Sequence, residues 1–203
     1  MKRDEAGARS HLVFYMITFG GFVGLASFLT IFFHDGYGVS RVAAGNLTAL
    51  CVCAGSFARP VGGYLADRLG GIRLLFVLFG VIAALMLAMS RLPALPLATR
   101  LLFLSMATLG MGNGVVFQIV PQRFHREIGV ATGLVGATGG LGGFLVPSFL
   151  GILKDVAGSY GTGFLLFGVA ALGGVLLLWT VQHGWQRSWA TSGRAATLGA
   201  VGD

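Results

Sequence analysis

The chain has 203 residues, of which 55% are hydrophobic and only 10% are charged. Ordinary soluble domains carry about 25% charged residues, so this composition excludes an ordinary soluble domain and suits a lipid environment. The formal net charge of +7 does not indicate nucleic-acid binding, because the basic residues stand between apolar segments rather than along one polar surface. We therefore expect a protein embedded in a lipid bilayer, with no nucleic-acid partner.

Six apolar segments are long enough to cross a bilayer as helices, which takes roughly 17 to 25 residues each. The expected spans cover residues 12–33, 44–66, 73–92, 98–119, 128–152 and 162–182. The sequence predicts a cytoplasmic segment at 1–11, a six-helix transmembrane domain at 12–182 and a disordered cytoplasmic tail at 183–203. The first span is longer than a signal-peptide core, so we expect it to remain in the protein.

The distribution of basic residues predicts the orientation of these spans. If both termini are cytoplasmic, nine lysines and arginines lie inside: Lys2, Arg3, Arg9, Arg68, Arg73, Arg123, Arg126, Arg187 and Arg194. Four lie outside: Arg41, Arg91, Arg100 and Lys154. This excess on the cytoplasmic side agrees with the positive-inside rule, and we expect a multi-pass protein of the inner or plasma membrane.

The first span carries Tyr15, Phe19 and Phe22 at helical spacing on one face. Aromatic residues in such a position usually pack against other helices or face lipid. Beside a buried cation, a tyrosine hydroxyl and a phenylalanine face could also flank a flat anion and exclude water. Both interpretations of Tyr15 and Phe19 remain open.

Arg59 interrupts the second span, where a charged side chain costs at least about 2.5 to 3.5 kcal/mol. It precedes Asp67 by eight residues, or roughly 12 Å along a helix, which is at the limit of snorkelling to the surface. All seven acidic residues fall in tails, loops or helix ends: Asp4, Glu5, Asp35, Asp67, Glu127, Asp155 and Asp203. A guanidinium without a carboxylate, facing a cavity, would bind an anion, and its planar fork suits a planar oxyanion.

The second span ends in a glycine-rich and charged segment, which reads Gly62-Gly63-Tyr64-Leu65-Ala66-Asp67-Arg68-Leu69-Gly70-Gly71-Ile72-Arg73. Its glycines permit a tight turn and close helix contact, and Asp67 can hold an arginine or cap a neighbouring helix. The segment resembles the Gly-x-Leu-Ala-Asp-Arg-x-Gly loop of the major facilitator superfamily. We expect Gly63, Asp67 and Arg68 to serve helix packing or conformational change.

The fourth span contains Asn113 among glycines, and its amide could donate to an anion or bond across helices. The fifth span carries a stripe of small residues: Gly129, Gly133, Gly136, Gly140 and Gly143. Close helix packing explains such a stripe. Bare backbone could also approach a small substrate and let helices slide during alternating access.

Catalytic and metal sites are not indicated. The four histidines lie at membrane edges or in loops without ligand spacing, and no nucleophile pairs with a base. Cys51 and Cys53 stand two apart on one helix, so they cannot easily form a disulfide. We expect no metal, no cofactor and no enzymatic activity.

Four segments resemble the nitrate/nitrite porters of the major facilitator superfamily, and they correspond to the C-terminal six helices of that family. They are Phe14-Tyr15 with Thr18-Phe19-Gly20, Ala58-Arg59-Pro60 with the loop after it, Asn113-Gly114 to Pro121-Gln122-Arg123-Phe124, and the glycine-rich stretch Gly133 to Pro147. The resemblance implies an all-α polytopic membrane fold, one half of a major facilitator fold with a 3+3 inverted repeat. It implies nitrate or nitrite as the substrate.

The resemblance also implies roles for individual residues. Arg59 would be one of two substrate arginines, Tyr15 and Phe19 would flank the anion, and Gly133 and Gly136 would line the site. The second arginine belongs to the N-terminal half of the family, which this sequence lacks. We therefore expect transport only with a complementary six-helix half or a second copy; the alternatives are a non-transporting remnant and an anion-sensing membrane component.

Overall fold

The computed structural model describes residues 16–123 and 128–199, and most of them are helical. The elements are η1 (Met16–Gly20), a π-helical turn, followed by α2 (Gly21–Tyr37), α3 (Arg41–Leu69), α4 (Gly71–Met89), α5 (Leu95–Arg123), α6 (Ile128–Ala157) and α7 (Tyr160–Gly199). Within the described ranges, six helical stretches are long and apolar enough to cross a membrane, with η1 and α2 forming the first. The prediction of six spans in an all-α fold is confirmed. Tyr15 and the predicted segment 1–11 lie outside the described residues.

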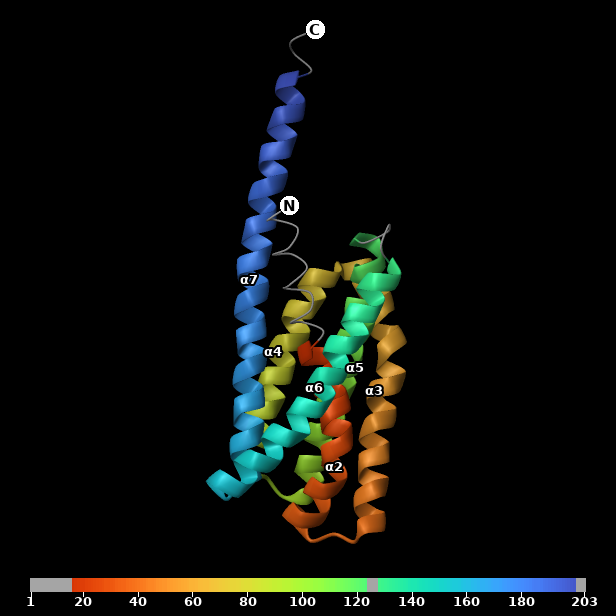
Figure 1. Ribbon diagram of the computed structural model, residues 1–203, viewed down its shortest axis with the longest axis vertical. Helices are drawn as coiled ribbons and strands as arrows, with labels where there is room; N and C mark the ends of the chain where they lie inside the picture. Colours follow the sequence, from red (N-terminus) through yellow and green to blue (C-terminus); the bar gives the residue numbers. More distant parts are fainter. Residues whose placement is uncertain (1–15, 124–127, 200–203) are drawn as a thin grey trace.

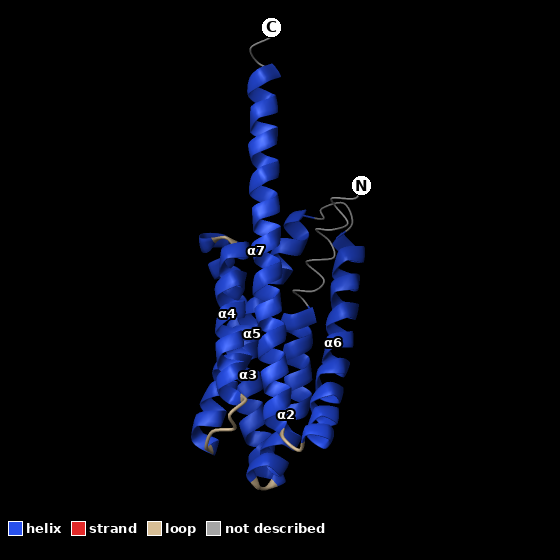
Figure 2. Cartoon of the chain, turned by 90° about the vertical axis from the view of Figure 1, so that its left-hand side faces the viewer, coloured by secondary structure: helices blue, strands red, loops and turns tan. Residues whose placement is uncertain are grey.

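Figure 1 shows the six spans side by side and alternating in direction. The connections at 38–40, 90–94 and 158–159 lie at one end of the bundle, and Gly70 joins α3 to α4 at the opposite end. Figure 2 shows the same bundle turned by a quarter, in which α7 stands beside α4 and projects beyond the other helices.

Two of the connections are fixed by residues that suit a tight turn. Gly38 ends α2 with φ of 66°, a left-handed conformation that glycine adopts at little cost, and its N–H donates to the carbonyl of His34. Ser40 then caps α3, because its side chain accepts a hydrogen bond from the backbone N–H of Ala43 at 3.2 Å. Gly70, with φ of 87°, is the single residue between α3 and α4.

The helix pairs follow an internal repeat. α3 packs on α5 and α2 packs on α6, each pair running in the same direction, whereas α4 packs on α7 in opposite directions. Matching the first three spans in order onto the last three makes α2 equivalent to α5, α3 to α6 and α4 to α7. Under this match the α3/α5 pair corresponds to the α6/α2 pair, and the α4/α7 pair corresponds to itself. This is the symmetry of a 3+3 inverted repeat, which the family resemblance implies.

Glycines bring both equivalent pairs into backbone contact. A Cβ atom placed on Gly20 would lie 2.7 Å from the Cα atom of Gly142, and one placed on Gly110 would overlap the carbonyl group of Gly55. No larger residue fits at these positions without moving a helix. The glycine content of the chain therefore sets the spacing of α2 from α6 and of α3 from α5.

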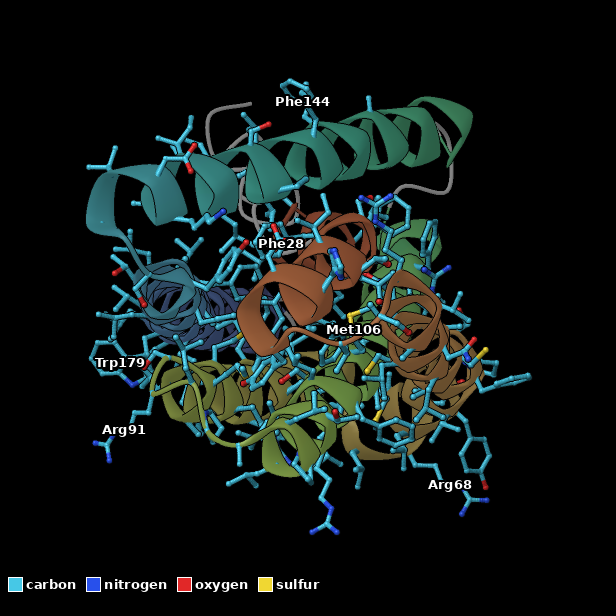
Figure 3. The ribbon with its side chains drawn as sticks, turned by 90° about the horizontal axis from the view of Figure 1, so that it is seen from below. Phe28, Arg68, Arg91, Met106, Phe144 and Trp179 are labelled. Carbon is cyan, nitrogen blue, oxygen red and sulfur yellow. The ribbon has the colours of Figure 1, made fainter. Side chains whose placement is uncertain are left out.

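The core is aliphatic and aromatic. The ring of Phe32 meets the rings of Tyr37, Tyr160 and Phe164 edge-on, with centroids 5.0 to 5.5 Å apart. Seen from below in Figure 3, Phe28 lies within the bundle, whereas Phe144 points away from it on the outer side of α6. No other described part of the chain thus covers the outer side of α6 at Phe144.

The last helix is longer than predicted. α7 continues to Gly199, so the backbone is helical over most of the range 183–203, for which the sequence analysis expects a disordered tail. The sequence beyond Trp179 contains no proline and includes alanine, glutamine, arginine and leucine, which are good helix formers. The polar composition of this segment argued against a packed core, but it does not prevent a single helix from continuing.

Candidate functional site

Arg59 lies inside the span formed by α3, ten residues before the end of that helix at Leu69, or roughly 15 Å along its axis. Its side chain is partly buried. The next residue, Pro60, has no backbone N–H, so the helical hydrogen bond to the carbonyl of Ser56 is missing. The helix is therefore locally weakened beside the arginine.

Two phenylalanine rings surround the guanidinium. The Cζ atom of Arg59 is 4.7 Å from the ring centroid of Phe22 and 5.6 Å from that of Phe19. The Nε atom is enclosed and has no hydrogen-bond partner in the described part of the chain. Ring faces attract a cation through their quadrupole but accept no strong hydrogen bond, so part of the hydrogen-bonding capacity of Arg59 is unused.

No carboxylate among residues 16–123 and 128–199 neutralises Arg59. The acids described, Asp35, Asp67 and Asp155, are exposed near helix ends. Among the described residues, the two aromatic contacts are therefore what stabilises the charge at this depth. The structure thus brings together Arg59 and Phe19, two of the residues that the sequence analysis selects.

Helix α5 fixes the orientation of α3 at Arg59. A Cβ atom on Gly114 would overlap the backbone carbonyl of Arg59, and one on Gly63 would lie 3.8 Å from the carbonyl oxygen of Gly114. These close backbone contacts limit rotation of α3 about its axis. The arginine side chain is thereby held on the side of α3 that faces η1 and α2.

Asn113 lies apart from any open surface. It is fully buried, and neither its amide nitrogen nor its amide oxygen has a hydrogen-bond partner in the described region. The neighbouring Gly112 packs against Thr18 of η1, where an added Cβ atom would lie 2.7 Å from the Thr18 methyl carbon. The carboxamide is therefore enclosed within this six-helix bundle.

The glycine stripe of α6 divides into two parts. A Cβ atom on Gly133, Gly136 or Gly140 would meet no other atom within 4 Å, and all three residues are exposed. At Gly143 the added atom would instead lie 2.7 Å from a side-chain carbon of Val23. In the described ranges, only the second part packs against another helix, and none of the contacts described joins Gly133 or Gly136 to Arg59.

The charged end of α3 is exposed. Asp67 and Arg68 lie at the surface, and the guanidinium carbon of Arg68 is 4.6 Å from the ring centroid of Tyr64 one turn earlier. In Figure 3, Arg68 extends away from the bundle. Gly63, by contrast, belongs to the α3/α5 interface.

The cavity between η1, α6 and α7 does not suit an anion. It measures about 280 Å³, and its lining is apolar, with Met16, Leu145, Phe149 and Phe167 among the contributing residues. Over the same described ranges, no group of three or more histidine, cysteine, aspartate or glutamate side chains could hold a metal ion. Among the described residues, Arg59 is thus the one whose surroundings and charge suit an anion.

Sequence reasoning missed two features of this site. Helical spacing puts Phe22 on the aromatic face with Tyr15 and Phe19 but predicts no role for it, although its ring is the nearer one to Arg59. Gly55 was not singled out, although it lies one helical turn before Arg59, and a side chain there would overlap the ring of Phe22. The three-residue spacing of Phe19 and Phe22 was the signal available.

Comparison with known proteins gives the family. The model of the Major Facilitator Superfamily matches residues 6–147. The nitrite extrusion protein of Bacillus subtilis is 35% identical over 181 residues, which cover 86% of this chain and 46% of the relative. The probable nitrate/nitrite antiporter NarK1 of Thermus thermophilus is 33% identical, with 79% of this chain and 41% of the relative covered.

A third relative agrees with these two. The probable nitrate/nitrite transporter NarK2 of Mycobacterium tuberculosis H37Rv is 37% identical, over 83% of this chain and 43% of the relative. The chain spans about half the length of the curated relatives that it matches. This chain is therefore an integral membrane protein of the major facilitator superfamily, and its relatives are nitrate/nitrite porters of that superfamily.

Proposed function

We propose that this chain is one six-helix half of a transporter for nitrate or nitrite, and that it works by alternating access together with a complementary half or a second copy. The names and lengths of its relatives support this proposal, since each is about twice as long and is named for nitrate or nitrite. The lipid bilayer is the other partner, and the proposed activity requires no cofactor and no enzymatic step.

The observation that carries the proposal is the environment of Arg59. A guanidinium lies inside a spanning helix between two phenylalanine rings, with an unpaired Nε atom and no carboxylate from the described residues. Nitrate and nitrite are planar and negatively charged, so two oxygens can accept hydrogen bonds from adjacent N–H groups of the guanidinium. The anion would supply the negative charge that balances the guanidinium, and the apolar surroundings would strengthen the attraction between the two.

The exposure of α3 and α6 supports a missing second half. Only 22% of the spanning window of α3 and 17% of that of α6 is buried, against 39% to 56% for the other four spans. Large apolar side chains cover their outer sides, including Phe57, which is 79% exposed, and Phe144, which is 70% exposed. Arg59 and the open glycines belong to these same two helices, so a partner that covers them would also enclose the site.

We assign the remaining selected residues as follows. Phe19 would flank the anion with Tyr15. Gly133 and Gly136 would line the completed site, since no other helix of the described ranges approaches them. Asn113 would contribute to the anion site only if the helices rearrange, because its carboxamide is enclosed in this conformation. Helix packing would be the role of Gly63 and Gly143 within this chain, and of Gly140 against the partner.

The proposed orientation places both termini in the cytoplasm of a cell with the chain in its inner or plasma membrane. Arg68 and Arg73 then lie on the cytoplasmic side with Asp67, while Arg41 and Arg91 lie outside. The exposed segment Asp67-Arg68 at the end of α3 would contact the partner or the lipid surface during conformational change.

Nitrate uptake into proteoliposomes tests the proposal. The full chain is reconstituted alone and together with the N-terminal half of a matched relative, and nitrate entry is followed with an internal nitrate sensor. We expect no entry above background for the chain alone and saturable entry for the pair. Saturable entry for the chain alone would indicate that a second copy completes the site.

Two further outcomes correspond to the alternatives. Nitrate binding by the purified pair without entry would support an anion sensor and contradict transport. Neither binding nor entry, with the two halves shown to co-purify, would support a non-transporting remnant.

A further inference from the structure

Phe22 is the closer of the two rings to Arg59 and the more enclosed. The distance from the Arg59 Cζ atom to the Phe22 centroid is 4.7 Å, within the range of roughly 6 Å in which a ring face attracts a cation. Phe22 is 5% exposed, whereas Phe19 is only partly buried. Phe22 therefore lies behind the guanidinium, where an anion from the open side would not reach it.

The backbone of α3 accommodates this ring. Gly55 precedes Arg59 by four residues, so the two positions share one face of the helix. A Cβ atom at Gly55 would overlap the ring of Phe22, so only glycine leaves room for the ring directly beside the arginine. The glycine and the phenylalanine together place an aromatic face under the guanidinium.

An aromatic neighbour differs from a carboxylate in whether it uses the N–H donors of the guanidinium. A carboxylate would accept the N–H groups of Arg59 and neutralise its charge, and an incoming anion would have to compete with it. A ring face attracts the cation without accepting its in-plane N–H groups as an ion pair does. The charge is thus held in place without its in-plane donors being used by the ring.

We propose that Phe22 is a positioning residue that holds the guanidinium of Arg59 toward the anion site without neutralising it. This inference rests on the proposed function of Arg59 as an anion-binding residue. It assigns Phe22 a role distinct from that of Phe19, which would contact the anion itself. Ordinary core packing is the competing explanation for a buried phenylalanine, and the experiment must separate the two.

The first measurement reads the position of Arg59 without any anion. The full chain is labelled with ¹⁵N-arginine in lipid nanodiscs, and the Arg59 Hε resonance is identified by its loss in Arg59→Lys. Ring currents from Phe22 and, at the longer distance, Phe19 should shift this resonance, and Phe22→Leu should remove the larger contribution. Phe33→Leu is the matched control, because Phe33 is also a buried phenylalanine of α2 but has its ring contacts with Phe32 and Tyr37.

The second measurement is nitrate affinity by calorimetry on the assembled carrier. Phe22→Leu should weaken binding about 2- to 30-fold, which corresponds to about 0.5 to 2 kcal/mol at 1.4 kcal/mol per tenfold change. Replacing Phe22 with mono-, di- and trifluorophenylalanine keeps its size but weakens the negative ring face step by step. Affinity should fall with each added fluorine at position 22 and stay constant for the same series at position 33.

The outcomes are distinguishable. An Arg59 resonance that is unchanged in Phe22→Leu overturns the inference, and so does an affinity that is insensitive to fluorination at position 22. If the unmodified carrier binds no nitrate, the proposed function fails. The resonance of Arg59 then decides by itself whether Phe22 positions the guanidinium.

Discussion

Gly62 on α3 lies directly against the backbone of Met111 on α5, so that a methyl group at position 62 would overlap the Met111 carbonyl oxygen. Gly110 on α5 lies equally close to the backbone of Gly55, seven residues before Gly62 on α3. The helix that carries Arg59 is therefore in direct backbone contact with α5. Substituting these glycines with larger residues should therefore disturb the packing along the whole α3/α5 interface.

We predict that Gly62→Ala lowers the free energy of unfolding by about 1 to 3 kcal/mol, because the added methyl group forces α3 away from α5. The control is Gly80→Ala on α4, where an added Cβ atom meets open space. That variant should be as stable as the original chain or slightly more so. Denaturant unfolding in detergent, followed by circular dichroism, compares the two; equal stability would show that α3 and α5 are not in backbone contact.

The two parts of the glycine stripe on α6 should respond differently to substitution. Gly143→Ala should destabilise the chain, because the methyl group would collide with Val23. Gly136→Ala should leave the stability of the isolated chain unchanged, because an added Cβ atom there would contact none of the described residues of other helices. In the assembled carrier, however, Gly136→Ala should reduce nitrate uptake if that surface lines the site. A stability loss at Gly136 matching that at Gly143 would refute this division of α6.

A hydrogen bond joins α2 to α3 within the spans. The hydroxyl of Thr30 donates to the hydroxyl of Thr48 at 3.1 Å. We expect Thr30→Val to cost about 0.6 kcal/mol, the average for interhelical hydrogen bonds in a membrane protein. Ser27→Ala is the control, because Ser27 bonds only to the Val23 carbonyl of its own helix. The difference in unfolding free energy between the two variants measures the bond; no difference would mean that it contributes nothing.

The exposed side of α6 should matter for assembly and not for folding of this chain. Phe144 is 70% exposed and points outward, so Phe144→Ala should leave the stability of the isolated chain unchanged but weaken its co-purification with a complementary half. Leu176 on α7 is similarly exposed, at 66%, but it belongs to a helix that is better covered. Leu176→Ala should alter neither property. A stronger effect at Leu176 would place the partner on the opposite side.

Most of the fold follows from the sequence. Apolar length predicts all six spans, because a helix in a bilayer satisfies its own hydrogen bonds and needs a set number of apolar residues. The boundaries differ by a few residues, since α3 and α4 extend the spans predicted at 44–66 and 73–92 until only Gly70 separates them. The π-helical turn η1 was not foreseen, because nothing local at Met16–Gly20 distinguishes it from an α-helix.

The site is less predictable, because it depends on how helices are rotated against one another. The rarity of charge in a spanning helix was enough to select Arg59, and helical spacing was enough to select Phe19. The enclosure of Asn113 and the division of the glycine stripe between Gly140 and Gly143 depend on packing between helices. The pattern of residues along one helix does not show which neighbouring helix will cover each of its faces. The roles of the selected residues in anion binding remain predictions.

If the guanidinium of Arg59 binds the transported anion, nitrate flux through reconstituted, fully assembled carrier must fall in Arg59→Lys. Lysine keeps the positive charge but loses the planar pair of donors, so we predict that nitrate flux at subsaturating concentration falls about 10- to 100-fold, the equivalent of about 1.5 to 3 kcal/mol. Flux through Arg59→Lys equal to that of the unmodified carrier would contradict the claim.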